Sequence, residues 1–263
     1  MGGSVGIVGV IVFLLYAFLG GSGSGTDGMQ QVLEQLQQTS VSQQTTTEFD
    51  GQDNYEVFTS KVVGSSNDVW RQVLQREGGS YSEPRLVLFR QATQSGCGVA
   101  TAAVGPHYCP LDQTIYLDET FFDVLTTQFG ARGGDVAQAY VIAHEVAHHA
   151  QNELGIMEQV QMAQRQYPDS ANDLSVRLEL QADCFAGVWA YSVSKQGVLE
   201  PGEVNEALDA AAAVGDDRVQ ASTEGQANQE SWTHGSSEQR TEWFNRGYVN
   251  GQPSLCDTFA GSR

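Results

Sequence analysis

Apolar side chains recur every three or four residues through much of the chain, which is the spacing that buries one face of a helix. Two long helices are predicted: one over residues 133–155, with Asp135 as its N-cap and Gly155 as its stop, and one over residues 168–197. Shorter helical patterns cover residues 65–79, about 201–214 and 236–248. Helices therefore dominate the expected fold.

Two short stretches have the pattern of strands instead. Residues 84–91 contain the apolar run Leu86–Phe89, which is typical of a buried or half-buried strand. Residues 114–122 begin as a strand and continue into a helix, and the inner face of that helix is expected to carry Phe121, Phe122, Val124 and Leu125. Few strands among many helices indicate an α+β fold, mainly helical, with a small β-sheet.

The chain begins with an apolar run from Val5 to Gly21 that carries no charge. A membrane-spanning helix needs about 20 residues, and the flanking glycines extend the run to that length. No basic residue precedes the run and no A-x-A site follows it, which favours an uncleaved anchor over a cleaved signal peptide. Residues 22–48 are rich in Gly and Ser, then in Gln and Thr, as in a flexible linker. We therefore expect a membrane segment over 1–21, this linker, and one domain over 49–263.

The composition excludes one class of partner. Of the 263 residues, 32 are Asp or Glu and 13 are Lys or Arg, which gives a formal net charge of −19. A chain this acidic repels phosphate backbones, and no cluster of Lys or Arg interrupts the acidity. No nucleic-acid partner is expected.

The four cysteines bear on the compartment. None of Cys97, Cys109, Cys184 and Cys256 belongs to a C-x-x-C pair, which argues against a zinc ribbon or a thioredoxin-type motif. Buried free thiols in a cytosolic protein and two disulfides in an oxidising compartment are both compatible with the cysteines alone. The apolar N-terminal segment favours the disulfides, and with them a single-pass protein of the cell membrane whose domain lies outside the cytoplasm. Three pairings are possible; a local Cys97–Cys109 bridge is the simplest and leaves Cys184–Cys256 as the second.

Three of the five histidines lie within residues 143–155, where His144, Glu145 and His148 spell H-E-x-x-H. Residues four apart share one face of a helix, so both imidazoles can bind one zinc ion, with the glutamate beside it as a base for water. The surrounding positions are apolar, and buried ionisable groups are costly without partners. A hydrogen-bonded network in the core is the alternative interpretation. His149 points about 100° away from His148 and is a poor ligand.

A third ligand must come from another segment, because two histidines alone do not hold a catalytic zinc ion. Glu179 and Asp183 are four apart on the second long helix, on a face shared with small and apolar residues, so both are expected to point inward. We predict that Glu179 binds the metal and that Asp183 bonds the second ring nitrogen of a histidine. A solvated acidic stripe is the alternative. The other candidate ligands are Glu153, Glu158 and His234.

Several segments resemble the neutral zinc metallopeptidases, a bacterial family with one N-terminal membrane segment: HEVAHH, ELQADCFAGVWA, CGVATAAVGPHYCP, IYLDETFF, THGSSEQR, WFNRGY and CDTF. The resemblance extends from about Phe49 to Phe259. It implies a zincin-like metallopeptidase domain, with H-E-x-x-H on one helix and E-x-x-x-D on the next, and a peptide or protein substrate. The family usually has an aromatic residue where this chain has His107, for which an exposed loop histidine is the simplest interpretation.

The expected activity is that of a zinc-dependent endopeptidase in which Glu145 is the general base. His234 is the candidate for stabilising the oxyanion of the tetrahedral intermediate, against an alternative role in capping and packing the helix that follows it. Weaker candidates for the oxyanion are Tyr108, Tyr116 and Arg240. A protein of another class is the alternative: a membrane-tethered binding or assembly module whose zinc site is structural or vestigial.

Overall fold

The computed structural model describes residues 54–90, 92–101, 104–127, 130–131, 134–200, 202–223 and 227–260. The expected membrane segment and linker lie outside these ranges. None of the helices formed by the described residues combines the length and apolar character needed to cross a membrane.

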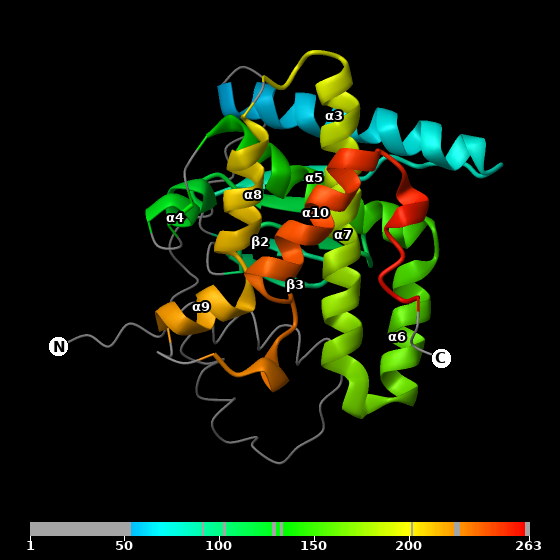
Figure 1. The fold of residues 1–263 in the computed structure, drawn as a ribbon, viewed down its shortest axis with the longest axis vertical. Coiled ribbons are helices and arrows are strands. Elements are labelled where there is room, and N and C mark those ends of the chain that lie inside the picture. Colours follow the sequence, from blue (N-terminus) through cyan, green and yellow to red (C-terminus); the bar gives the residue numbers. More distant parts are fainter. Residues whose placement is uncertain are drawn as a thin grey trace.

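Helix α5, Asp135–Glu153, lies at the centre of a helical layer. It packs against α3 (Asn54–Arg76), α7 (Ala171–Lys195) and α8 (Val204–Ala213), while α10 (Ser237–Asn250) crosses α7 and α8 (Figure 1). The five helices include all five segments that the periodicity indicated. Their ends lie close to the predicted ones except at the start of α3, and the N-cap of α5 also differs.

Helix α3 begins eleven residues earlier than predicted, because Thr59, Val62 and Val63 extend its buried face through Gly64. Helix α5 has Gly134 as its N-cap and no side-chain cap, so the assignment of Asp135 as N-cap was wrong. Asp135 is instead the first helical residue, where its carboxylate is favoured by the positive end of the helix dipole.

The remaining elements connect these helices. Gly155, in the left-handed conformation with φ 71°, ends α5 and turns the chain into α6, which runs beside α7 (Figure 1). A strained φ of this kind favours glycine. Helices α6 and α9 were not predicted from the sequence. Val124 and Leu125, which were expected on the inner face of α4, lie outside the residues whose side chains the structure describes. These elements and the short 3-10 turns have the bounds α4 Phe121–Thr127, α6 Ile156–Gln166, α9 Asp216–Thr223, η1 Pro168–Ser170, η2 Gln229–Ser231 and η3 Pro253–Leu255.

The strands form two small sheets. In the first, β5 (Thr114–Asp118) lies between β1 (Arg85–Phe89), to which it is parallel, and β4 (His107–Cys109), to which it is antiparallel. The second is a hairpin of β2 (Ala92–Ser95) and β3 (Gly98–Thr101). The described fold is thus α+β and mainly helical, as the sequence indicated.

Successive residues of the three-stranded sheet face opposite sides, as the pleat requires. Ile115 and Leu117 pack into the helical core, whereas Tyr116 packs with Phe89 and Ala100 on the side of the hairpin. All five residues of β5 are buried because both of its faces are covered. The apolar run in the sequence reflects this double burial.

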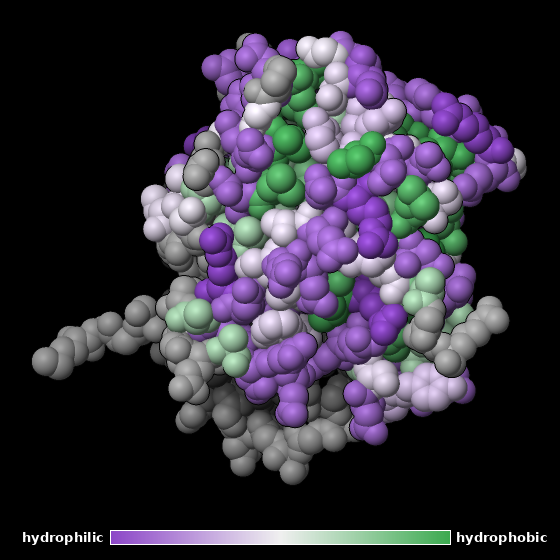
Figure 2. Space-filling view, viewed as in Figure 1, coloured by the Kyte–Doolittle hydropathy of each residue, from purple (hydrophilic) through white to green (hydrophobic). Residues whose placement is uncertain are grey.

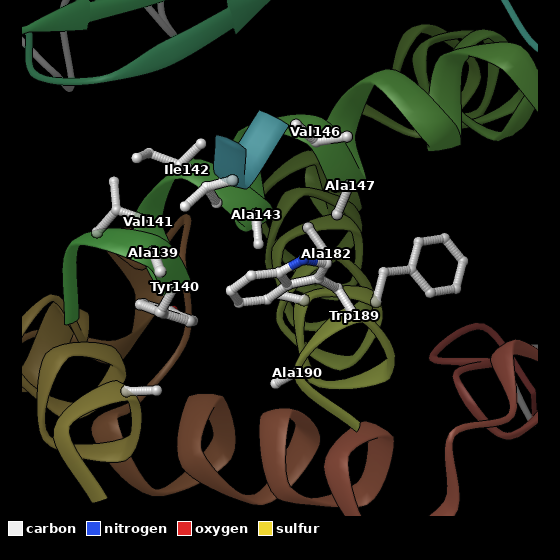
Figure 3. Packing of buried hydrophobic residues seen from close by; sticks show 14 of the residues in the cluster. Ala139, Tyr140, Val141, Ile142, Ala143, Val146, Ala147, Ala182, Trp189 and Ala190 are labelled. Carbon is white, nitrogen blue, oxygen red and sulfur yellow. The ribbon is translucent and has the colours of Figure 1, made fainter. Parts of the chain in front are cut away.

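Small side chains bring the two long helices together. Ala139, Ala143 and Ala147 of α5 face Ala182, Trp189 and Ala190 of α7 (Figure 3). Helices α7 and α10 are closer still: a Cβ on Gly187 would lie 2.1 Å from the carbonyl oxygen of Phe244, and one on Gly247 would lie 1.9 Å from that of Cys184. These contacts place α5, α7 and α10 within side-chain reach of one another. The face in view in Figure 2 is largely hydrophilic, with apolar residues scattered over it.

Candidate metal centre

His144 and His148 of α5 meet Glu179 of α7 at the interface of the two helices. Nε2 of His144 lies 3.1 Å from Nε2 of His148 and 3.1 Å from Oε2 of Glu179, and His148 Nε2 lies 3.3 Å from Glu179 Oε1. Both histidines are buried, and the Glu179 side chain is 19% exposed. These are the three residues that the sequence analysis expected to bind the metal, and in the described part of the chain they form a single group able to hold an ion.

The second ring nitrogen of His144 bonds an ionic cluster. Nδ1 of His144 lies 2.9 Å from Oδ1 of Asp183, which has no exposed surface. The same carboxylate accepts from Tyr140 Oη at 2.6 Å and from Arg240 Nε and Nη2 at 2.8 and 2.9 Å. Arg240 also donates to the carbonyl of Val214. Asp183 thus occupies the place beside a histidine that its spacing predicted, and α10 contributes the countercharge.

The second ring nitrogen of His148 bonds a neutral group. Nδ1 of His148 lies 2.8 Å from Oε1 of Gln151, a buried residue of the same helix. The amide nitrogen of Gln151 donates in turn to the carbonyl of Leu178 at 2.7 Å and to Gln181 Oε1 at 3.1 Å. Gln181 donates to the carbonyl of Cys256 at 3.1 Å. Sequence reasoning missed Gln151, although it lies three residues from His148 and so on the same helical face.

The charges of the site interact strongly. Burial opposes protonation of His144, but Asp183 and Glu179 raise its pKa to about 10. Burial also opposes ionisation of Asp183, yet Arg240 and His144 lower the pKa of its carboxyl to about 2. For Glu179 the cost of burial is outweighed by His148 and His144, which hold its pKa well below the usual range. The surroundings therefore favour the ionised form of both carboxylates.

The donor set fits zinc. Bonds of about 2.0–2.1 Å in a tetrahedral arrangement separate neighbouring donor atoms by roughly 3.3 Å, close to the distances among the three side chains. The Nδ1 atoms of both histidines are committed to Asp183 and Gln151, so each ring directs its Nε2 toward the common point. Two ring nitrogens and a carboxylate that converge in this way need a cation or a shared proton between them.

Glu145 is the next residue along α5 and is 6% exposed. Its carboxylate makes no hydrogen bond or ion pair with any residue that the structure describes. A buried carboxylate normally has partners, so Glu145 is unusual among the described residues.

His234 lies in the loop between η2 and α10. Asp216 at the start of α9 holds this loop: its Oδ2 accepts from the backbone nitrogens of Thr233, His234 and Gly235 at 2.8, 2.7 and 2.9 Å, and its Oδ1 lies 3.2 Å from His234 Nδ1. Burial disfavours the charged ring, but Asp216 and Glu179 raise the pKa of His234. The residue is therefore within electrostatic range of Glu179. Helix capping is not its role, because Ser236 caps α10 in a capping box with Gln239.

Asp216 was not anticipated. It follows Gly215, whose missing side chain lets the turn approach the backbone of Ser237. Its contact with His234 lies 18 residues further along the chain, a separation for which the sequence carries no periodic signal. Burial opposes its ionisation, but bonds to His234 and to the backbone lower the pKa of Asp216.

The third histidine of the cluster, His149, has no exposed surface and points away from the metal site. Its Nε2 lies 2.6 Å from the carbonyl of Ser82 and its Nδ1 3.0 Å from Tyr108 Oη. Burial lowers the pKa of His149, which favours a neutral ring that donates to Ser82 and accepts from Tyr108. It joins α5 to β4 and to the loop before β1, which agrees with its being a poor ligand.

The other candidate residues lie elsewhere. The hydroxyl of Tyr116 bonds Asp112, and its ring stacks on His107 on the side of the sheet that faces the hairpin. Arg240 is committed to Asp183. Glu153 accepts from the backbone nitrogen of Ser82, and Glu158 lies on the exposed side of α6. Neither glutamate is part of the metal-binding group.

The four cysteines form two disulfides, Cys97–Cys109 and Cys184–Cys256. The first joins the hairpin to β4, where Cys97 and Cys109 pack in the smaller apolar cluster. The second joins α7, one residue after Asp183, to the C-terminal segment. It closes a loop across 72 residues of sequence.

Comparison with known proteins places the chain in one family. The model of a family described as "Putative neutral zinc metallopeptidase" matches residues 1–259. The uncharacterized protein YpfJ of Escherichia coli (strain K12) is 44% identical over 261 residues, which are 99% of this chain and 88% of that protein. An uncharacterized protein of Mycobacterium tuberculosis (strain ATCC 25618 / H37Rv) is 47% identical over 225 residues, 81% of this chain and 74% of that protein. No solved structure matches the chain significantly.

Proposed function

Because the chain belongs to the neutral zinc metallopeptidase family, we propose that it is a zinc-dependent endopeptidase. The observation that carries the proposal is the convergence of His144, His148 and Glu179 at one point, beside a glutamate with no partner among the described residues. A peptide or protein is the proposed substrate.

His144, His148 and Glu179 would hold the zinc ion, which when bound makes a water molecule acidic and polarises a carbonyl group. Asp183 and Gln151 keep the two imidazoles turned toward the ion. Glu145 accepts the proton of the attacking water and delivers it to the leaving amine. A carboxylate is suited to both steps because it can carry the proton between them.

His234 is proposed to stabilise the negative charge that develops on the carbonyl oxygen of the substrate. Asp216 bonds Nδ1 of its ring, which leaves Nε2 as the free donor. Asp216 and Glu179 both raise its pKa, which favours the protonated ring that this role needs.

The alternative function, a binding module with a structural zinc site, is less consistent with the donor set. Structural zinc sites are closed by four protein ligands, whereas catalytic sites have three and an open position. Among the described residues the group consists of three ligands, and Glu145 would have no use beside a closed site.

The test is the substitution Glu145→Gln. We expect this variant and the unaltered protein both to bind zinc at one equivalent, and the variant to lose at least about 100-fold in the cleavage of a mixed peptide library. Metal analysis and mass spectrometry of the products measure the two properties. Glu158→Gln, an exposed substitution on α6, is the control. Zinc binding without cleavage by the unaltered protein would favour the binding module, and turnover by Glu145→Gln would remove the general-base assignment.

The proposed location is the outer side of the cell membrane, with residues 1–21 as a single membrane-spanning anchor. The two disulfides support an oxidising compartment for the domain. Digestion of intact spheroplasts by an added protease measures the location: the domain is expected to be accessible without lysis, and protection until lysis would contradict the proposal.

A further inference from the structure

We propose that Gln151 and Gln181 are positioning residues that fix the tautomer of His148 through a chain of hydrogen bonds with one possible direction. The chain ends at the backbone carbonyl of Cys256. The proposal rests on the proposed function only in that His148 is taken as a zinc ligand, because the hydrogen bonds join residues of the protein itself.

The direction is determined at the far end of the chain. A backbone carbonyl can only accept, so Nε2 of Gln181 must be the atom that donates to Cys256, at 3.1 Å. Oε1 of Gln181 therefore faces Gln151 and accepts from its Nε2, also at 3.1 Å. The carbonyl of Leu178, 2.7 Å from the same Nε2, requires the same orientation of the Gln151 amide. Two backbone carbonyls thus orient two amides without ambiguity.

The near end of this chain of hydrogen bonds determines the tautomer of His148. With its nitrogen directed to Leu178 and Gln181, Gln151 presents Oε1 to Nδ1 of His148 at 2.8 Å. An acceptor at that distance requires a proton on Nδ1. In the neutral ring Nε2 is then bare, and it is this atom that faces His144 and Glu179. The opposite tautomer would place two acceptors against each other and would block the metal with a proton.

Burial makes this orientation costly to change. Gln151 has no exposed surface, and Gln181 and His148 are 5% and 8% exposed, so no bulk water replaces a lost partner. A buried polar group left unpaired is unfavourable, and this cost disfavours the wrong tautomer.

The terminal carbonyl is itself held in place. Cys256 is bonded to Cys184, three residues beyond Gln181 on α7, and both cysteines are fully buried. Two further bonds join the following residues to the same helix: Arg177 donates to the carbonyl of Thr258 at 3.0 Å, and Thr258 Oγ1 donates to the carbonyl of Arg177 at 2.7 Å. The C-terminal segment therefore serves as the fixed acceptor that orients a ligand on another helix.

The test uses Gln151→Met and Gln181→Met, which preserve side-chain length and approximate volume but remove the amides. Long-range proton–nitrogen NMR spectra of the metal-free protein, at a pH where the ring of His148 is neutral, report its tautomer. Competition with a zinc chelator reports affinity. We expect Gln151→Met to show a mixture of tautomers, and Gln181→Met to show a smaller fraction of the Nε2–H form because Leu178 still holds Gln151. The zinc dissociation constant should rise about 10- to 100-fold for Gln151→Met and less for Gln181→Met, since the latter leaves Leu178 as a partner of Gln151.

The matched control is Gln164→Met. Gln164 is also buried, at 8% exposed, and donates to the carbonyl of Ala171 and to Ser175, but has no link to the metal-binding group. It should lose stability while the tautomer of His148 and the zinc affinity stay unchanged. If a glutamine variant fails to fold, the double variant Cys184→Ser/Cys256→Ser, which releases the carbonyl and keeps both amides, is expected to shift the tautomer partly.

A single Nδ1–H tautomer in Gln151→Met and Gln181→Met, with zinc affinity equal to that of Gln164→Met, would overturn the proposal. If the unaltered protein bound no zinc, the proposed function would fail. The tautomer in the metal-free variants would still decide whether the chain of amides orients His148.

Discussion

The two histidines of the H-E-x-x-H motif are held by environments of opposite character. His144 bonds Asp183, which is ionised against Arg240 in a fully buried cluster. His148 bonds a neutral amide whose orientation is set by backbone carbonyls. A charged partner makes the imidazole more basic as well as orienting it, which the pKa of about 10 for His144 reflects. A neutral partner orients the ring without adding charge to a site that already contains Glu179.

The two sides of the motif should tolerate substitution differently. An ionic cluster is stable only while all its charges are present, because breaking a buried pair leaves an uncompensated charge. A chain of amides loses one hydrogen bond at a time. Substitutions on the His144 side should therefore affect both stability and metal binding, and those on the His148 side chiefly the metal.

Asp183→Asn should have the largest effect. It leaves Arg240, which is 4% exposed, without a countercharge and His144 without its anionic partner. We expect a loss of about 3–5 kcal/mol in the free energy of unfolding and a rise of about 100-fold in the zinc dissociation constant. Urea denaturation of the metal-free protein and chelator competition measure the two.

The control for this prediction is Asp173→Asn. Asp173 pairs with Arg177 on the same helix, but its side chain is 62% exposed, and it should change neither quantity by more than a small amount. The contrast between the two histidine environments would be contradicted if Asp183→Asn lowered the free energy of unfolding and the zinc affinity no more than Gln151→Met does.

Asp216→Asn tests a third imidazole, that of His234, which has an anionic partner outside the ligand set. The substitution removes the acceptor of several backbone bonds and of the His234 ring, so turnover of a peptide substrate should fall about 10- to 100-fold while zinc affinity is preserved. Steady-state kinetics and chelator competition separate the two. A loss of zinc binding equal to that of Asp183→Asn would indicate that Asp216 supports the fold and not His234 alone. The matched control is Asp217→Asn, because Asp217 accepts from the backbone nitrogen of Ser237 at the start of α10.

Tyr140→Phe should have the smallest effect. The hydroxyl of Tyr140 is one of several donors to Asp183, and Arg240 continues to compensate the charge after it is removed. We expect a loss of about 1 kcal/mol in the free energy of unfolding and a change of no more than about threefold in zinc affinity. Thermal unfolding with and without zinc measures both. A loss comparable with that of Asp183→Asn would show that the hydroxyl, and not the countercharge, dominates the cluster.

Much of the fold followed from local patterns. Helical periodicity located five helices, and the apolar runs located β1 and β5, because burial imposes a period on any element with a covered face. The hairpin of β2 and β3 escaped detection because Ala100 is its one buried strand residue and the strands carry no apolar alternation. Helix α6 escaped because only Val160 and Gln164 are buried along it.

The candidate metal-binding group and its partner Asp183 could be predicted from the sequence, because each half is a spacing on one helix: His144 and His148 four apart, Glu179 and Asp183 four apart. The remaining side chains that orient the group depend on the tertiary structure. Arg240 reaches Asp183 across 57 residues, and the carbonyl of Cys256 reaches Gln181 across 75. Contacts of this kind depend on which helices pack together and how closely, where small residues such as Gly187 set the approach. The periodic pattern shows that a helix has a covered face but does not show which helix covers it.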